Sequence, residues 1–433
     1  MKKFKLKKRC GMCSGKDFFE ILNIGEMPPA NAFLEKKDFD KEESFPLGVQ
    51  LCKNCKSLQL RQVISPKLIF QDYCYATRAS KPLVEHFHRL AEEIANNYVQ
   101  SSNDLVIEIG SNDGALLSKI KDRCRVLGID PASNMAKTAI QEGVPTLVEF
   151  FDTKLSEKIK SEMKEARVIV ANNVMAHIED LRDVFSGVKK LLSPEGKFIF
   201  EVHWVGNLLN EGGFDQIYHE HLYYHSLHSL QVLLNSLGMT VNDVKLVPIH
   251  GESIRVYAGN SGTSSEAVRK LLDCEIEMGL LDTKTYQNFS KKVESNKGKL
   301  NKLLAKLKKD GKKIVGYGAP AKGNTLLNYF KIGPEILDYI TDTTPSKQGK
   351  YTPGTHILVV SPEILLKDLP DYALLLSWNY ADAILEKEKE LRKKGLKFII
   401  PVPEVRIVEL CNDKPFENLA NFSINSVAKA IIP

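Results

Sequence analysis

Residues 105–130, LVIEIGSNDGALLSKIKDRCRVLGID, constrain the fold of this chain more than any other stretch. Residues 105–109 form an apolar run with one acid, which is typical of a buried parallel strand, and 126–129 form a second such run. A turn of small residues follows the first run, and 115–121 has helical periodicity. We therefore expect a strand, a tight turn, a helix and a second strand, as in a doubly wound α/β domain.

The turn between these strands is suited to a small polar ligand. Gly110 and Gly114 let the backbone approach closely, the helix start offers N–H groups, and Asp130 at the second strand's end can accept from a ribose diol. A dinucleotide site would carry G-x-G-x-x-G, whereas here Glu108 precedes Gly110-x-x-x-Gly114. This form resembles the first motif of class I methyltransferases that use S-adenosylmethionine (SAM). The alternative, a tight connection without a ligand, leaves Asp130 without a role.

Further cofactor contacts are expected where later strands end, because open α/β sheets bind ligands at the carboxyl ends of their strands. The strand predicted at 168–171 is followed by polar residues, although His177 fits equally well as a residue that fills a helix start. The expected SAM contacts are Glu108, Gly110, Ser111, Asn112, Gly114, Asp130, Asn172, Asn173 and His177.

Four of the eight cysteines form two C-x-x-C pairs, Cys10 with Cys13 and Cys52 with Cys55. Each pair can chelate one ion with two thiolates, and two pairs complete a tetrahedral sulfur site for Zn²⁺. Because all four positions are filled by protein, this zinc is expected to be structural. The 38 intervening residues must fold back as a small unit of their own. A redox C-x-x-C would need only one pair.

Composition bounds the class of protein. A chain of 433 residues with 43% hydrophobic content can form two or three domains with real cores. No apolar run reaches the ~18 residues of a membrane span, and MKKFKLKKRC lacks the apolar core of a signal peptide, so we expect a cytoplasmic protein that does not contact membranes. The net charge of +6 is spread out, and its lysine clusters are interpreted as solvated faces or as attraction to phosphorylated ligands.

Five of the ten histidines lie in the 26-residue window 203–228. The H-E-H sequence does not give the helical face of an H-E-x-x-H metal site, so the cluster favours proton transfer. Histidine titrates near working pH, glutamate can orient it, and tyrosine can donate to a developing oxyanion. His221 is the expected base, with Tyr218 and Glu220 beside it. His219 and His225 are rivals, because on an extended segment His219 and His221 would share a face.

A second glycine-rich turn occurs in KKIVGYGAPAKGNTLLNYF, after a lysine-rich helical connector over 261–310 that breaks near 282–283. A strand, a turn and a helix start again indicate a site for a phosphate-bearing ligand, although a second Rossmann-like unit kept only for packing has the same pattern. Later strand ends add polar residues. The expected substrate contacts here are Gly318, Ala321, Lys322, Gly323, Asn324, Asp342, Lys347 and Asn379.

Taken together, the paired C-x-x-C, E-I-G-S-N-D-G, Y-H-E-H-L-Y-Y and V-G-Y-G-A-P-A-K-G-N resemble the nucleotide-sugar C-methyltransferases of deoxysugar biosynthesis over essentially the whole chain. The resemblance implies a zinc-binding domain (1–71), a SAM-binding α/β domain of the class I methyltransferase type (72–260), and a connector with a Rossmann-like nucleotide-sugar domain (261–433). The implied reaction is methylation at carbon 3 of a nucleotide-linked 4-keto-6-deoxy sugar.

The family's catalytic residues correspond to His221, Tyr218 and Glu220. A tyrosine in the segment before the SAM domain corresponds to Tyr73, as a substrate contact, or to Tyr75, as a catalytic residue. The family's Ser-Ser pair is not intact at Ala76-Thr77.

Two other functions fit parts of the sequence. An RNA methyltransferase could combine zinc knuckles with a SAM domain, but the chain has no basic stripe interleaved with aromatic residues, which argues against nucleic acid. A non-catalytic SAM-binding scaffold would give the cluster of side chains around His221 no function. We expect a nucleotide-diphosphate sugar as the substrate and a monomer or weak oligomer.

Overall fold

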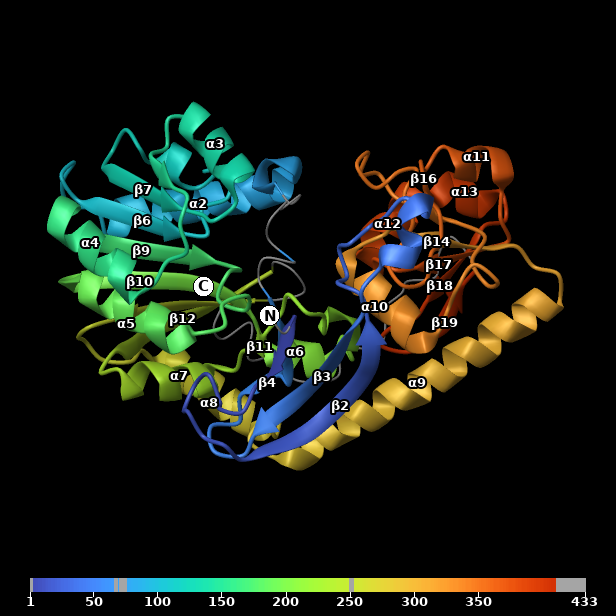
Figure 1. The fold of residues 1–433 in the computed structure, drawn as a ribbon, viewed down its shortest axis with the longest axis horizontal. Coiled ribbons are helices and arrows are strands. Elements are labelled where there is room, and N and C mark those ends of the chain that lie inside the picture. The colour runs from blue at the N-terminus through green and yellow to red at the C-terminus, as the bar shows by residue number, and fades with distance from the viewer. Residues whose placement is uncertain (1–2, 66–68, 70–75, 249–252, 410–433) are drawn as a thin grey trace.

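The computed structural model describes residues 3–65, 69, 76–248 and 253–409 (Figure 1). Tyr73 and Tyr75 lie outside the described residues. The described strands form sheets of seven, six, four and two strands. The seven-stranded and six-stranded sheets lie at opposite sides of the molecule, and the four-stranded sheet lies between and below them (Figure 1).

The seven-stranded sheet has the order β12-β13-β10-β9-β6-β7-β8. The five neighbouring strands β10, β9, β6, β7 and β8 are parallel, and β13 is antiparallel to both of its neighbours, β10 and β12. Helices α2 and α3 cover one face, and α4 and α5 cover the other (Figure 1). This is the expected doubly wound arrangement, and it brings the carboxyl ends of five parallel strands to one edge. The elements are α2 Lys81–Asn97, β6 Leu105–Ile109, β7 Arg125–Ile129, α3 Ser133–Gln141, β8 Thr146–Leu147, α4 Thr153–Met163, β9 Ala166–Asn172, α5 Leu181–Leu191, β10 Leu192–His203, β12 Thr240–Val247 and β13 Ser253–Gly259.

The helix predicted over 115–121 is wrong. The structure has only the 3-10 turn η3 (Leu117–Lys119) there, so no α-helix begins between Gly110 and Lys121. The apolar residues that gave the helical pattern, Leu116, Leu117 and Ile120, are buried in the cluster that α2 covers, so their spacing reflects packing of a compact loop. Seven residues also provide few intrahelical bonds to offset the cost of helix nucleation.

The four-stranded sheet has the order β11-β4-β3-β2 and draws its edge strand from far along the chain. Strand β11 (Tyr223–Tyr224) pairs antiparallel with β4, with Tyr223 opposite Gln59, and Leu60 N–H donates to the Leu222 carbonyl at 2.9 Å. The N-terminal unit is therefore joined to the central domain by main-chain pairing. The other elements are β1 Phe4–Leu6, β2 Phe18–Met27, η1 Lys36–Lys41, β3 Phe45–Cys52, β4 Leu58–Leu60 and β5 Gln62–Ile64, with β1 paired to β5.

The six-stranded sheet has the order β16-β15-β14-β17-β18-β19, parallel except for β19. The expected connector is two helices, α8 and α9, that break where Asp282 caps α9 by accepting from Lys284 N–H. The long helix α9 passes beneath the C-terminal sheet (Figure 1). The elements are α8 Glu266–Glu277, α9 Thr283–Lys309, β14 Ile314–Tyr317, α10 Ala321–Phe330, β15 Ile340–Thr341, β16 Val359–Val360, α11 Ile364–Asp368, β17 Tyr372–Leu375, α12 Ala381–Lys387, α13 Lys389–Lys393, β18 Lys397–Ile400 and β19 Arg406–Val408.

Short elements link the sheets. They are η2 Thr77–Ala79, α6 Val205–Asn210, η4 Phe214–Gln216, α7 Leu227–Ser236 and η5 Trp378–Tyr380. Within the described part of the chain, no helix is long and apolar enough to cross a membrane.

Candidate active site and metal centre

The four paired cysteines converge at one point. Their sulfur atoms all lie within 4.8 Å of one another, with Sγ–Sγ distances of 3.5 Å between Cys10 and Cys55 and 3.6 Å between Cys13 and Cys52. Four thiolates around zinc at ~2.3 Å place their sulfurs ~3.8 Å apart, so this cluster fits the ion. Gln59 Nε2 donates to Cys10 Sγ at 3.1 Å, as expected of a residue that orients a metal ligand.

Two side chains of the central domain, Arg182 and Tyr223, contact the knuckle formed by Cys10 to Cys13. Arg182 Nη1 donates to the Met12 carbonyl at 2.8 Å, and Tyr223 Oη donates to the Glu179 carbonyl at 2.7 Å. A Cβ at Gly11 would lie 1.8 Å from Tyr223 Oη, so only glycine permits this approach. The knuckle and β11 are thus packed as one unit.

The glycine turn after β6 has the strained backbone that a close ligand approach requires. Gly110 and Gly114 have φ values of 70° and 73°, and Asn112 has a φ of 50°. A Cβ at Gly110 would lie 2.9 Å from Val174 Cγ2. Thr77 N–H donates to Asn112 Oδ1 at 2.9 Å. Thr77, one of the two positions where the family's Ser-Ser pair is not intact, therefore contacts the glycine turn.

Asp130 lies directly beside this turn. Its Oδ2 accepts from Asn112 N–H and its Oδ1 from Ala132 N–H, each at 2.8 Å, which leaves further lone pairs for a ribose. Burial raises the pKa of Asp130 and holds that of Glu108 well above its usual range. Among the described residues, Glu108 Oε2, Ser111 Oγ and Asn173 Oδ1 are buried without a hydrogen-bond partner. Buried polar atoms of this kind fit a site that a polar ligand completes.

His221 lies in a defined hydrogen-bond network. Its Nδ1 is 3.0 Å from the Gln216 carbonyl oxygen, and its Nε2 is 2.9 Å from Tyr218 Oη. Because a carbonyl oxygen only accepts, the proton of the neutral ring is assigned to Nδ1, and Nε2 then accepts from the Tyr218 hydroxyl. The basic atom of the imidazole therefore faces Tyr218.

Two further histidines surround His221. The ring centroids of His177 and His203 lie 5.2 and 5.3 Å from that of His221. Burial lowers the pKa of His177 to about 4, so this ring is neutral at working pH. His177, predicted as a cofactor contact, thus lies beside His221 and five residues after the end of β9.

The rival histidines are placed elsewhere. His221 N–H donates to the Tyr218 carbonyl at 3.0 Å, which closes a turn, so the alternation expected for an extended segment does not apply. His219 packs edge-on against Phe45 with ring centroids 6.1 Å apart, and His225 stacks on Tyr223 at 5.9 Å. Burial lowers the pKa of His219 to about 4 and that of His225 to about 3.

Glu220 marks the point where three parts of the chain meet. Asn31 Nδ2, from the loop after β2, donates to Glu220 Oε1 at 2.7 Å, and Asn324 Nδ2 of α10 donates to the Ala30 carbonyl at 2.7 Å. Burial raises the pKa of Glu220 to about 7. Asn31 was missed in the sequence, where only its place after two prolines distinguishes it.

The predicted substrate contacts of the C-terminal sheet gather around the turn 318–321. Asp342 Oδ2 accepts from Ala319 N–H at 2.7 Å, and Lys347 Nζ donates to the Ala319 carbonyl at 2.8 Å. Lys322 Nζ lies 3.8 Å from the centroid of the Trp378 ring. The other predicted contacts lie in or beside this turn or shortly after β17, and they are Gly318, Ala321, Gly323, Asn324 and Asn379. The Oδ1 atoms of Asn324 and Asn379 are buried without a hydrogen-bond partner among the described residues.

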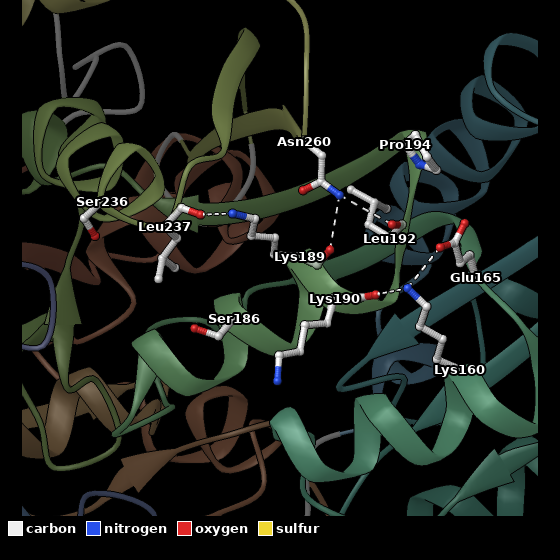
Figure 2. A pocket seen from close by; sticks show the side chains of 10 residues that line it. All are labelled: Lys160, Glu165, Ser186, Lys189, Lys190, Leu192, Pro194, Ser236, Leu237 and Asn260. Carbon is white, nitrogen blue, oxygen red and sulfur yellow. Dashed lines mark hydrogen bonds and ion pairs between the residues drawn. The ribbon is translucent and has the colours of Figure 1, made fainter.

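A surface hollow of about 740 Å³ lies elsewhere (Figure 2). It is lined by Glu165, Leu192 and Pro194 at the amino ends of β9 and β10, opposite the edge that carries Asn172. Lys160 donates to the Lys190 carbonyl and pairs with Glu165 (Figure 2). The hollow is therefore separate from the candidate active site.

Known proteins match the chain along most of its length. Family models match residues 10–70 (putative zinc binding domain), 75–244 (methyltransferase domain) and 248–403 (C-methyltransferase C-terminal domain). The C-methyltransferase NovU of Streptomyces niveus is 37% identical over 404 residues, which cover 92% of this chain and 96% of NovU. An uncharacterized methyltransferase of Schizosaccharomyces pombe is 27% identical over 125 residues, 28% of this chain and 48% of that protein.

Among solved structures, the SAM-bound magnesium protoporphyrin IX methyltransferase ChlM of Synechocystis PCC 6803 is 14% identical, with a TM-score of 0.32 over 45% of this chain and 89% of that chain.

The cysteine cluster and the glycine turn fall within the segments matched as zinc-binding and methyltransferase domains. The predictions of a SAM-binding α/β domain and of zinc and SAM as cofactors are confirmed.

Cys52→Ser should lose the zinc, because three sulfur ligands leave the tetrahedral site incomplete. Elemental analysis should find about one zinc per chain in the unaltered protein and far less in the variant. Cys274→Ser, a buried thiol outside the cluster, is the matched control and should retain the metal. Full zinc content in Cys52→Ser would contradict the assignment of the ligands.

Asp130→Asn should weaken SAM binding by about 1.5–3 kcal/mol, roughly 10- to 150-fold, because a charged acceptor is lost from the ribose site. Isothermal titration calorimetry measures this directly. Asp104→Asn is the control, since Asp104 also accepts from two backbone N–H groups, those of Gln100 and Ser101, but on the exposed surface. Equal SAM affinity in the two variants would move the ribose site elsewhere.

Proposed function

The chain belongs to the zinc-binding C-methyltransferases, and from this we propose that it methylates carbon 3 of a nucleotide-linked 4-keto-6-deoxy sugar. The observation that carries the proposal is the network of Gln216, His221 and Tyr218. His221 lies beside His177 of the central domain, and Asp215, next to Gln216, contacts Trp378 of the C-terminal domain. NovU, the relative that matches nearly the whole chain, is itself a C-methyltransferase. SAM supplies an electrophilic methyl group when it is bound.

Carbon 3 of such a sugar lies beside the carbonyl at carbon 4, and it becomes nucleophilic only after its proton has been removed. The Gln216 carbonyl keeps the ring proton of His221 on Nδ1, so that Nε2 can take the proton from carbon 3. The electron pair of the broken C–H bond moves to form an enolate, whose negative oxygen needs a hydrogen-bond donor. Tyr218, released from Nε2 when that atom is protonated, can donate to this oxygen or relay the proton.

Glu220 serves the same reaction as a nearly neutral carboxyl group. With a pKa of about 7, it retains its proton for much of the time at working pH and can donate to a sugar hydroxyl or carbonyl. Asn31 orients it by donating to Oε1. A buried ionised carboxylate at this place would oppose the enolate, so the burial that raises the pKa of Glu220 favours the reaction.

The C-terminal glycine turn is proposed to hold the diphosphate of the nucleotide sugar. Gly318 has a φ of 80°, and a Cβ there would lie 2.4 Å from Ser377 Oγ, so the backbone is open only without a side chain. The start of α10 follows, and its N–H groups favour an anion. Lys347 adds a positive charge beside Ala319. These donors lie in the domain whose Trp378 contacts Asp215, the residue before Gln216.

His221→Ala should slow exchange of the carbon 3 proton with solvent deuterium by ~10²–10⁴-fold, because the general base is removed. The exchange of a 4-keto nucleotide sugar is followed by mass spectrometry without SAM, so methyl transfer does not obscure it. His228→Ala, a half-buried histidine on α7, is the control and should exchange at the original rate.

If His221→Ala exchanged at the original rate while His219→Ala did not, the base would be misassigned. Labelled SAM with total RNA tests the competing class, and methyl incorporation into RNA but not into the sugar would contradict the proposed function.

A further inference from the structure

The segment that fixes His221 is packed against the C-terminal domain. Phe214 of η4 stacks on Phe330 of α10, with ring centroids 4.9 Å apart and an interplanar angle of 12°, and its centroid lies 5.8 Å from that of Tyr329. Phe214 and Phe330 are both fully buried. The position of η4 is therefore set by a helix from the domain that carries the second glycine turn.

A buried carboxylate next to Phe214 adds a directional contact. Asp215 is inaccessible to solvent, and its Oδ2 accepts from Trp378 Nε1 at 2.6 Å. Burial raises the pKa of Asp215, while the positive charge of Lys322 and the Trp378 hydrogen bond act in the opposite direction. Lys322 Nζ is itself buried over the Trp378 ring. A carboxylate so enclosed has few alternative positions, because moving it would leave a buried charge or donor unpaired.

The residue after Asp215 supplies the acceptor for the imidazole. The Gln216 carbonyl accepts from His221 Nδ1, and the turn is closed by Ile217 N–H, which donates to the Phe214 carbonyl at 2.9 Å. A shift of Asp215 therefore moves the Gln216 carbonyl with it. Without that acceptor, the proton of the neutral ring can reside on either nitrogen, and the molecules that carry it on Nε2 no longer present a basic atom there.

We propose that Trp378 and Asp215 are positioning residues for catalysis: the C-terminal domain, through the Trp378–Asp215 hydrogen bond, holds the Gln216 carbonyl where it fixes the tautomer and orientation of His221. This rests on the proposed function only in taking His221 as the base. The C-terminal domain then has a second role besides holding substrate, because its docking completes the base. Asn379, a predicted substrate contact, directly follows Trp378, so binding at the turn and alignment of His221 share one strand end.

The test is Trp378→Phe, which retains an aromatic ring but removes the N–H donor to Asp215. We expect kcat to fall by about 10- to 100-fold with little change in KM, because misplacement of a catalytic group by ~1 Å has effects of this size. SAM affinity should be unchanged. Tyr339→Phe is the matched control, since it removes a 2.6 Å hydrogen bond to the Asp368 carboxylate at the opposite end of the same sheet.

The tautomer is read directly from nitrogen chemical shifts of the full-length protein labelled with nitrogen-15 histidine, without substrate. The His221 signals are identified by their loss in His221→Gln. The original protein and Tyr339→Phe should show a protonated Nδ1 and an unprotonated Nε2, whereas Trp378→Phe should show averaging between the two tautomers. Asp215→Asn keeps an oxygen acceptor for Trp378 and should retain most of the tautomer preference.

An unchanged His221 tautomer in Trp378→Phe would overturn the inference, even if kcat fell, because the loss would then be merely structural. Failure of the unaltered protein to act on any 4-keto nucleotide sugar would contradict the proposed function instead. The spectroscopic result does not depend on that outcome, so the two failures are distinguishable.

Discussion

The antiparallel pairing of β11 with β4 is the interaction on which the rest of the site depends. It begins two residues after His221 and joins the segment proposed to be catalytic, residues 214–224, to the zinc-binding sheet. Two strand residues contribute few main-chain hydrogen bonds, each worth about 1 kcal/mol net, so pairing alone would be weak. Burial of the Tyr223 ring, which is 1% exposed, adds about 1.5–3 kcal/mol. Gln59, which lies opposite Tyr223 in this pairing, also donates a hydrogen bond to Cys10 Sγ. The zinc-binding knuckle thus stabilises β11 through Gln59 and through the close packing of Gly11 on Tyr223.

In the central domain, the pKa values of buried carboxyl groups shift in opposite directions according to the groups beside them. Burial alone would raise the pKa of Glu201, but His86 and Arg255 lower it, with His86 Nε2 at 2.9 Å and Arg255 Nε at 2.7 Å, so Glu201 stays ionised within the scaffold. Burial raises the pKa values of Glu108 and Glu220, for which no cation among the described residues offsets the effect. Since the folded-state pKa of Glu220 lies above its unfolded value, its contribution to stability decreases as the pH rises toward about 7 and is constant above that. In the proposed mechanism this cost is accepted because a neutral carboxyl group can donate a hydrogen bond to the sugar.

The parts of the fold predicted correctly from the sequence are those set by local chemistry. Gly110 and Gly114 need positive φ values, four cysteines at knuckle spacing need one ion, and alternating strands and helices need a parallel sheet. The helix over 115–121 was wrong because packing of a short loop imitates helical periodicity. Three contacts were missed because each joins residues more than 150 positions apart, and no local pattern encodes such a contact. They are the Asn31–Glu220 hydrogen bond, the pairing of β11 with β4, and the Trp378–Asp215 hydrogen bond.

The central claim is that the zinc-binding sheet holds the catalytic segment through β11. Hydrogen–deuterium exchange of the full chain, read by mass spectrometry before and after removal of zinc with a chelator, tests this most directly. The account predicts that residues 58–60 and 222–224 lose protection together, while β6 in the SAM-binding sheet stays protected. Loss of protection at 58–60 with unchanged protection at 222–224 would contradict it, because the segment would then be held by contacts other than those with the zinc-binding sheet.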